Sequence, residues 1–206
     1  NTEEVITSAL EMIKDLEKRI TVNASGSEVD EVNLAAGEKP VKVSADVYEL
    51  IKLGLKYSEE FDGAFDVTVG PLTALWHIGF DDAKKPTQEE IDAVLPLVNY
   101  KDVELNDAEQ TVFLKKKGMQ LDLGGIAKGY IADKVWEYFA KEGITTAVID
   151  LGGNIVVMGG SPARDGVAWN VGIQDPDASR GKTLGTILEK DKTIVTSGIY
   201  ERYLTV

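Results

Sequence analysis

The spacing of apolar residues changes near residue 101, and this change constrains the fold more strongly than any other feature of the sequence. Before it, apolar residues recur at three- and four-residue steps, the spacing of amphipathic helices. The first such stretch, residues 3–20, carries Ile6, Leu10, Ile13 and Ile20 on nearly one face. After residue 101 the apolar residues come in short β-branched runs separated by turn formers, which favours strands. The sequence therefore predicts helices followed by sheet.

Two further helices are expected in the first half of the chain. Ser44 can cap a helix over residues 45–61, and Thr87 with Glu90 has the spacing of a capping box that starts a short one. The polar segment ASGSEVDEVN, residues 24–33, lacks an obvious apolar repeat and is expected to be a loop.

The second half begins with an expected hairpin over residues 101–114. A strand over residues 119–123, a helix over 126–143 and a strand over 145–151 would together make one right-handed βαβ crossover, and short strands follow to the end of the chain. The expected fold is α+β: a single domain over residues 1–206 with a mixed or antiparallel sheet, packed helices and one βαβ crossover.

The charge balance argues against nucleic acid as a partner. The chain has 35 acidic and 22 basic residues and a net charge of −13, so it would repel a phosphodiester backbone over most of its surface. There is no cysteine, and His77 is the only histidine, which leaves a hard cation such as Mg²⁺ or Ca²⁺ as the favoured metal. No apolar run approaches the roughly 20 residues that span a bilayer.

The segment DLGG occurs twice, at residues 122–125 and 150–153. Gly124 and Gly125 stand between an expected strand and an expected helix, where backbone N–H groups can approach a phosphate without a Cβ in the way. The spacing matches neither the P-loop nor the dinucleotide fingerprint. An ordinary strand-to-helix turn explains the pattern as well as a ligand loop does, and Asp122 is then a local turn or cap residue.

Residues 61–80, FDGAFDVTVGPLTALWHIGF, interleave aromatic residues with glycines. Aromatic rings beside flexible turns suit a flat heterocycle that must be stacked, and they suit a protein core equally well. Lys128, one turn into the expected helix, is either a solvated surface residue or a partner for an anion.

Six segments in order carry a resemblance to a known family. They are ASGSEVDEVN, GAFDVTVGPLTALW, DLGGIAKGYIAD, VIDLGGNI, WNVGIQDP and TSGIYERY. Taken together they are similar to the motifs of the ApbE family, the FAD:protein FMN transferases. The resemblance covers about residues 24–203.

The resemblance implies an enzyme that uses Mg²⁺ and takes FAD as its substrate. Such an enzyme cleaves the pyrophosphate, attaches FMN through a phosphoester to a Ser or Thr of an acceptor flavoprotein, and releases AMP. An FAD pyrophosphatase that yields FMN and AMP, or a non-catalytic flavin-binding domain, remains an alternative. The resemblance also implies an extracytoplasmic protein anchored to the membrane as a lipoprotein in its full length.

The resemblance assigns roles to eight positions, and it leaves the catalytic base and the oligomeric state open. The expected flavin-nucleotide contacts are Ala64, Phe65, Asp66, Trp76, Gly124, Lys128 and Tyr130. Ala127 corresponds to the position that offers a backbone carbonyl to Mg²⁺. Because the family's Met-Gly-Thr, His-x-x-x-Pro and Asp-rich segments are not in this sequence, we expect a domain truncated at both ends that, by itself, binds FAD poorly and transfers FMN slowly or not at all.

Overall fold

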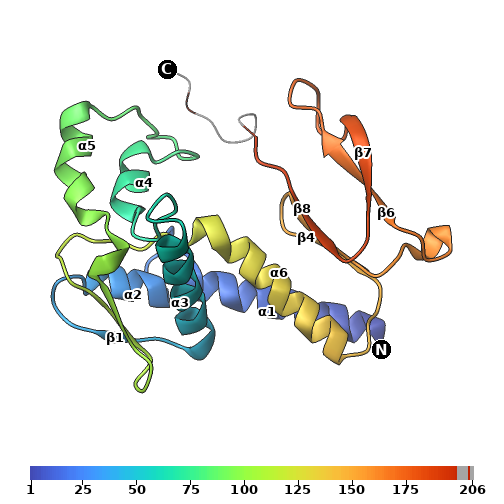
Figure 1. The fold of residues 1–206 in the computed structure, drawn as a ribbon, viewed down its shortest axis with the longest axis horizontal. Helices are drawn as coiled ribbons and strands as arrows, with labels where there is room; N and C mark the ends of the chain where they lie inside the picture. Colours follow the sequence, from blue (N-terminus) through green and yellow to red (C-terminus); the bar gives the residue numbers. More distant parts are fainter. Residues whose placement is uncertain (199–203, 205–206) are drawn as a thin grey trace. The chain divides into compact units, whose positions relative to one another are not determined.

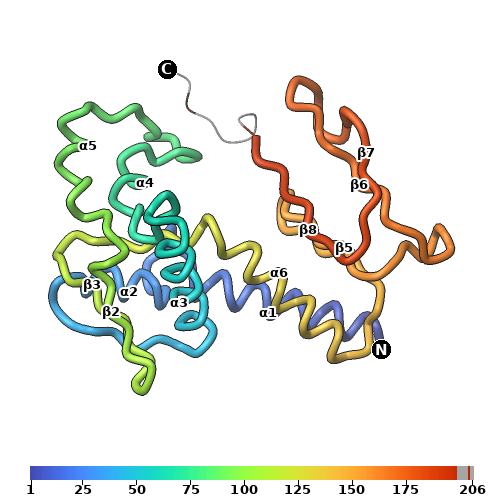
Figure 2. The backbone as a smooth tube through the Cα atoms, in the orientation of Figure 1, coloured from blue at the N-terminus to red at the C-terminus, as the bar shows by residue number. Residues whose placement is uncertain are grey.

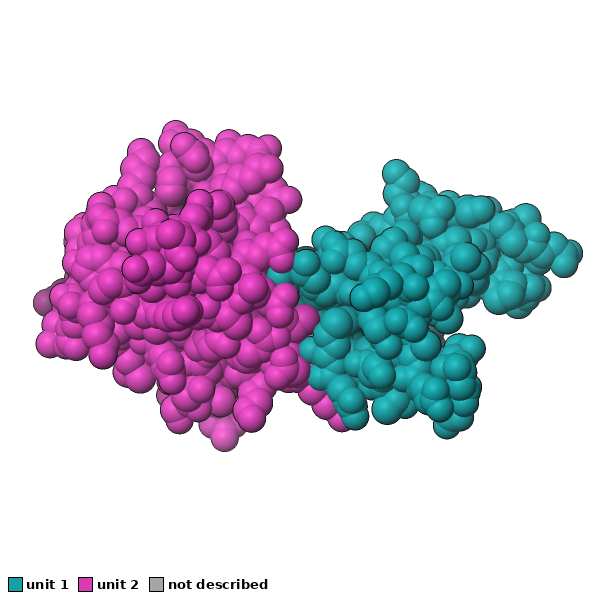
Figure 3. All heavy atoms as spheres, turned by 90° about the horizontal axis from the view of Figure 1, so that it is seen from below, with its two compact units in different colours: residues 1–13, 128–203 teal, residues 14–127, 204–206 magenta. Residues whose placement is uncertain are grey.

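The computed structural model describes residues 1–198 and residue 204, which form two compact units. Figure 3 colours them: unit 1 contains residues 1–13 and 128–203, and unit 2 contains residues 14–127 and 204–206. The boundary falls within two long helices, α1 (Thr2–Ile20) and α6 (Gly124–Lys141). Whether the two units form one domain stays a prediction.

Unit 2 combines short helices with a small antiparallel sheet (Figure 1). Its helices are α2 (Glu28–Leu34), α3 (Ala45–Glu60), α4 (Gly70–Trp76) and α5 (Gln88–Val94), with 3₁₀ turns at Leu95–Leu97 and Tyr100–Asp102. Its strands β1 (Val41–Lys42), β2 (Val103–Asn106) and β3 (Thr111–Leu114) pair in the order β1-β3-β2. Leu50, Ile51 and Val67 are wholly buried in its core.

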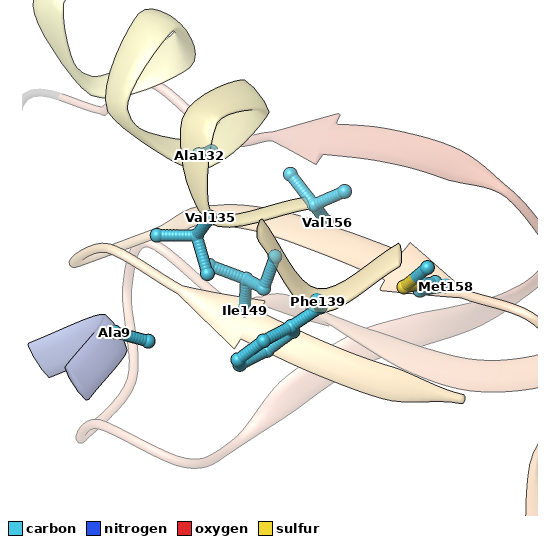
Figure 4. Close-up of a cluster of buried hydrophobic side chains, with 7 residues drawn as sticks. All are labelled: Ala9, Ala132, Val135, Phe139, Ile149, Val156 and Met158. Carbon is cyan, nitrogen blue, oxygen red and sulfur yellow. The ribbon is translucent and has the colours of Figure 1, made fainter. Parts of the chain in front are cut away.

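Unit 1 packs α6 on an antiparallel sheet in the order β4-β5-β8. These strands are β4 (Ala147–Asp150), β5 (Asn154–Met158) and β8 (Lys192–Val195). A 3₁₀ turn at Pro162–Arg164 precedes a two-stranded ribbon of β6 (Trp169–Gln174) and β7 (Thr183–Glu189), which can be followed in Figure 2. Side chains of α6, β4 and β5 interlock in the apolar cluster of Figure 4.

The expected helices and hairpin are confirmed. The stretch 3–20 is helix α1, the stretch 45–61 is α3, and residues 101–114 contain the β2–β3 hairpin. The Thr87–Glu90 capping box is present with both of its hydrogen bonds.

The buried stripe of α1 differs from the one that the sequence suggests. Ile6 and Leu10 are about half exposed, whereas Ala9 and Leu16 are buried. A small alanine lets a helix approach its neighbours closely, and Ala9 belongs to the cluster of Figure 4.

The prediction of a loop over residues 24–33 is wrong, because most of this segment is helix α2. The hydroxyl of Ser27 accepts a hydrogen bond of 2.9 Å from the backbone N–H of Asp30, which caps the helix. Val29 and Val32, three residues apart on α2, are its buried side chains. The polar residues are therefore one face of a short amphipathic helix.

The α+β class is confirmed, but the predicted βαβ crossover is not formed. Residues 119–123 form no strand and make only one isolated parallel bridge, between Val69 and Gln120. The backbone groups of Leu121 bond to a side chain and not to a strand. All strand pairs among residues 1–198 are antiparallel, including β4 with β5.

The sequence expectation of a last strand, over residues 200–206, lies outside the described residues apart from Leu204. Within the described part of the chain, none of the helices has the length and apolar character that crossing a membrane requires.

A charged contact joins the hairpin to α3 and should make stability depend on pH. Lys52 Nζ lies 2.8 Å from Asp107 Oδ1, and the hydroxyl of Tyr48 donates to the same oxygen at 2.8 Å. The hydrogen bond from Lys52, and after it the one from Tyr48, lower the pKa of Asp107. Burial and the neighbouring Asp107 carboxylate raise the pKa of Tyr48 to about 12.

We predict that Asp107→Asn lowers the free energy of unfolding at pH 7. A carboxylate with a lowered folded-state pKa stabilises the fold above its ordinary pKa of about 4, and this contribution disappears as the pH falls through the folded-state value. Urea denaturation should therefore show a larger difference from the unsubstituted protein at pH 7 than at pH 3. Asp81→Asn, at an exposed site, is the control; an equal difference at both pH values would contradict the ion-pair explanation.

Candidate functional site

A cavity of about 340 Å³ in unit 2 brings together two segments that lie far apart in the sequence. One is the loop before α4 with the start of that helix, and the other is the first DLGG. Its lining residues are Ala64, Phe65, Asp66, Val69, Thr73, Asp122, Gly124 and Gly125. Four of the seven predicted flavin-nucleotide contacts are therefore neighbours: Ala64, Phe65, Asp66 and Gly124.

The segment that carries the first DLGG is held from both sides. Asn33 of α2 donates from Nδ2 to the carbonyl of Leu121 at 3.1 Å, and its Oδ1 accepts the N–H of Leu121 at 2.7 Å. On the opposite flank the N–H of Asp122 donates to the carbonyl of Val67 at 2.8 Å. An asparagine side chain thus replaces a neighbouring strand, which fixes the segment beside the cavity.

Asp122 is the carboxylate at the start of α6. Its Oδ1 accepts the N–H of Gly124 at 2.9 Å, and its Oδ2 accepts the hydroxyl of Thr73 at 2.9 Å. The first bond satisfies one of the donors that a helix leaves free at its N-terminus. The bond from Thr73 links α4 to the segment that leads into α6, and both residues line the cavity. The expected turn or cap role of Asp122 is therefore present.

Thr73 is a lining residue that the sequence did not reveal. It lies in the middle of an apolar stretch, and its partner is 49 positions away in the sequence. Only the fold brings the two together.

Asp66 has a structural task in addition to its place in the cavity wall. Its Oδ1 accepts the N–H of Thr68 at 2.8 Å and the hydroxyl of Thr68 at 2.6 Å. Its Oδ2 accepts the N–H of Tyr100 at 3.0 Å. The carboxylate therefore shapes the loop that presents Phe65, because it joins that loop to the segment before β2.

The two glycines of the first DLGG are the first residues of α6, so the helix starts at Gly124 and not at residue 126 as expected. A Cβ at Gly125 would lie 3.0 Å from Cε2 of Phe65, so the aromatic ring rests against the helix backbone. A Cβ at Gly124 would lie 3.0 Å from Oδ1 of Asp122. A side chain at either position would require its neighbour to shift by a few tenths of an ångström, and both glycines are exposed.

Trp76 is not brought to this cavity. It lines a separate one of about 630 Å³ with side chains around the start of α5, among them Lys85, Pro86 and Ile91. The two cavities share no lining residue. Trp76 is the last residue of α4, and it lines only the second cavity.

The remaining predicted contacts belong to α6. Lys128 is exposed, and Tyr130 is buried with its ring 5.2 Å from Nζ of Lys134. Both belong to unit 1, whereas Gly124 and Ala127 belong to unit 2. Whether Lys128 and Tyr130 contact the nucleotide stays a prediction.

The described residues do not by themselves assemble a metal centre. Among residues 1–198 and 204, no group of three or more histidine or carboxylate side chains is arranged to hold an ion. Asp122, the carboxylate in the cavity wall beside α6, already accepts hydrogen bonds at both oxygens. Ala127 can contribute only its backbone carbonyl.

The second DLGG forms a tight turn. Asp150 ends β4, and its Oδ1 accepts the N–H of Gly153 at 3.0 Å. Gly152 and Gly153 have positive φ angles of 65° and 92°, so the chain can return at once as β5. Its local role in turn formation agrees with the simpler of the two sequence interpretations.

Comparison with known proteins identifies similar chains. The model of the ApbE family matches residues 2–206. An FAD:protein FMN transferase of Klebsiella pneumoniae is 39% identical over 98% of this chain and 61% of its own length. One of Treponema pallidum is 36% identical over 98% of this chain and 58% of its own length.

Solved structures agree with this similarity. The crystal structure of the ApbE protein of Thermotoga maritima matches all of this chain and 66% of its own with a TM-score of 0.89 and 31% identity. The flavin transferase ApbE of Vibrio cholerae matches 97% of this chain and 64% of its own with a TM-score of 0.82 and 28% identity. The chain therefore spans less than two thirds of the length of each of these four proteins.

We predict that Asn33→Ala lowers the free energy of unfolding by about 2 kcal/mol, because it leaves the buried N–H and C=O of Leu121 without partners. Urea denaturation measures the change. Asn170→Ala, at an exposed position of β6, should change stability by less than about 0.5 kcal/mol. If Asn33→Ala lowered the free energy of unfolding no more than Asn170→Ala does, water would be replacing the Asn33 amide as the partner of Leu121.

Proposed function

Since the chain belongs to the ApbE family, we propose that it forms the flavin-binding part of an FAD:protein FMN transferase. In this reaction the hydroxyl oxygen of a Ser or Thr of an acceptor protein bonds to the FMN phosphorus. The bond between that phosphorus and the bridging oxygen breaks, and AMP leaves with the oxygen, while the hydroxyl proton passes to the departing phosphate or to solvent. FAD and an acceptor flavoprotein are the proposed partners.

The meeting of the loop around Phe65 with the first DLGG in one cavity is the observation that carries this proposal. An aromatic ring on one wall and a helix start with two glycines on the other suit a ligand with a flat ring and phosphates. The N-terminus of α6 offers a favourable dipole to an anion, although the N–H of Gly124 there already donates to Asp122 Oδ1. Ala64, Phe65, Asp66 and Gly124 are the proposed contacts there.

Lys128, Tyr130 and Trp76 are also proposed contacts, and none of the three lines the cavity at Phe65. Lys128 and Tyr130 follow Gly124 along α6 and would meet other parts of an extended dinucleotide. Trp76 lines its own cavity, so a flavin contact from it requires a ligand that reaches beyond the one at Phe65.

Dependence on Mg²⁺ is part of the proposal, with the carbonyl of Ala127 as one ligand. A bound Mg²⁺ would neutralise pyrophosphate charge. Because the described residues add no metal-binding cluster, no step of the reaction is assigned to the ion. An extracytoplasmic location and a lipoprotein anchor in the full-length protein complete the proposal.

Incubation with FAD, Mg²⁺ and an acceptor protein that carries a Ser or Thr flavinylation site tests the function. We expect flavin fluorescence to stay with the acceptor after denaturing electrophoresis, with AMP released in equal amount. Free FMN with AMP would instead indicate an FAD pyrophosphatase, and unchanged FAD would indicate binding alone. Omission of Mg²⁺, with EDTA present, should abolish transfer.

Gly124→Val should abolish FAD-dependent activity while circular dichroism shows retained helix and sheet. The branched side chain would occupy the space beside Asp122 Oδ1 where the phosphates are proposed to approach. Gly185→Val is a matched control, because a Cβ at this exposed position of β7 meets nothing within 4 Å. Activity that survives Gly124→Val would remove the first DLGG from the phosphate site.

A further inference from the structure

Gly70, the first residue of α4, lies directly against the segment that leads to the first DLGG. A Cβ built on it would lie 2.6 Å from the carbonyl oxygen of Gln120 and 2.9 Å from its carbonyl carbon. Side chains do not approach backbone atoms this closely, so a residue larger than glycine would push the two segments apart. Gly70 is buried, and the lining of both cavities described above consists of other residues.

The close approach, and not the backbone conformation, is what requires glycine at this position. The φ angle of Gly70 lies outside the left-handed region, so alanine could adopt the same backbone conformation. Alanine would also favour the helix, since glycine lowers helix stability by up to about 1 kcal/mol. Glycine therefore weakens the start of α4 and in return permits the contact with Gln120.

The contact at Gly70 belongs to a short parallel pairing between the start of α4 and the segment before α6. The N–H of Gly70 donates to the carbonyl of Gln120 at 3.2 Å, and the N–H of Asp122 donates to the carbonyl of Val67 at 2.8 Å. The isolated bridge of Val69 lies in the same pairing. Because one segment carries the aromatic loop and the other carries the first DLGG, this pairing fixes the distance between the two walls of the cavity.

The same distance determines a hydrogen bond in the cavity wall. Thr73 lies three residues after Gly70, and its hydroxyl is 3.1 Å from the carbonyl oxygen of Gly70 and 2.9 Å from Asp122 Oδ2. The other carboxylate oxygen of Asp122 accepts the N–H of Gly124 at 2.9 Å. Thr73, Asp122 and Gly124 all line the candidate cavity. A wider contact at Gly70 would therefore move the Thr73 hydroxyl away from Asp122.

We propose that Gly70 is a positioning residue for FAD binding, because it sets the distance between the two cavity walls and keeps Thr73 within hydrogen-bonding distance of Asp122. The inference rests on the proposed function and adds to it a residue to which the resemblance assigns no role. Gly70 acts through Thr73 and Asp122 and not by contact with the substrate. All residues of this arrangement belong to unit 2, so it depends on one compact unit alone.

Gly70→Ala tests the inference in the whole chain. The added methyl group should separate the walls, so the affinity for FAD should fall about tenfold, as expected for the loss of one polar contact. Titration of FAD fluorescence with the protein, in the presence of Mg²⁺, measures the affinity, and high protein concentrations make weak binding measurable. Val112→Ala, a truncation in the buried core of unit 2, is the control: it should lower the melting temperature and leave the affinity unchanged.

A double-mutant cycle separates positioning from a general loss of stability. Thr73→Val removes the hydroxyl and keeps the shape of the side chain, so it should weaken FAD binding when residue 70 is glycine. In the Gly70→Ala protein the bond between Thr73 and Asp122 is already broken, and Thr73→Val should then have little further effect. Additive effects of the two substitutions would overturn the inference.

Gln120→Gly supplies a second background, in which Gly70→Ala meets less steric conflict. The Cβ of Gln120 lies 2.6 Å from the position of the added methyl group, and glycine removes it. In this background Gly70→Ala should still lower the affinity for FAD, by a smaller factor, because the carbonyl group of residue 120 remains. The comparison keeps the inference testable if Gly70→Ala alone does not fold, and equal affinities of the two Gln120→Gly proteins would then contradict it.

The remaining outcomes distinguish this inference from the proposed function. Unchanged affinity in Gly70→Ala overturns the inference alone, provided that the unsubstituted protein binds FAD. A fall in Val112→Ala as large as that in Gly70→Ala also overturns it, because the affinity would then follow stability. If the unsubstituted protein does not bind FAD, the proposed function fails, and the inference that rests on it fails as well.

Discussion

The pair of hydrogen bonds between the Asn33 amide and the backbone of Leu121 is the constraint on which the candidate site depends. A backbone segment buried away from water must find partners for its N–H and C=O groups. Here one side chain from α2 supplies both. The segment is thereby fixed without a neighbouring strand, and the following residues, Asp122 to Gly125, enter α6 at a defined point beside Phe65.

This constraint also explains which parts of the fold the sequence could predict. Helix α1, helix α3, the Thr87–Glu90 cap and the β2–β3 hairpin depend on neighbours in the chain, and local patterns predicted them correctly. The apolar alternation of residues 119–123 predicted a strand, because buried alternate residues look the same whether a strand or an asparagine satisfies the backbone. Because residues 119–123 form no strand, the predicted βαβ crossover is not formed either.

The candidate site was predictable in its composition but not in its arrangement. Resemblance to the ApbE family selected Phe65, Asp66 and Gly124, and the fold places all three at one cavity. Thr73 had no signal in the sequence, because its hydrogen-bond partner is 49 positions away. Trp76 was selected by the same motif as Phe65 and Asp66, yet it lines a different cavity.

The contact of the Phe65 ring with the backbone at Gly125 limits how this protein can evolve. Every amino acid other than glycine adds a carbon at a point 3.0 Å from the ring, so a substitution at Gly125 requires the ring to shift by a few tenths of an ångström. Buried aliphatic positions exchange residues of similar volume without such a shift. Substitutions at Gly125 and at Phe65 are therefore coupled, and a smaller residue at Phe65 would release the constraint on Gly125.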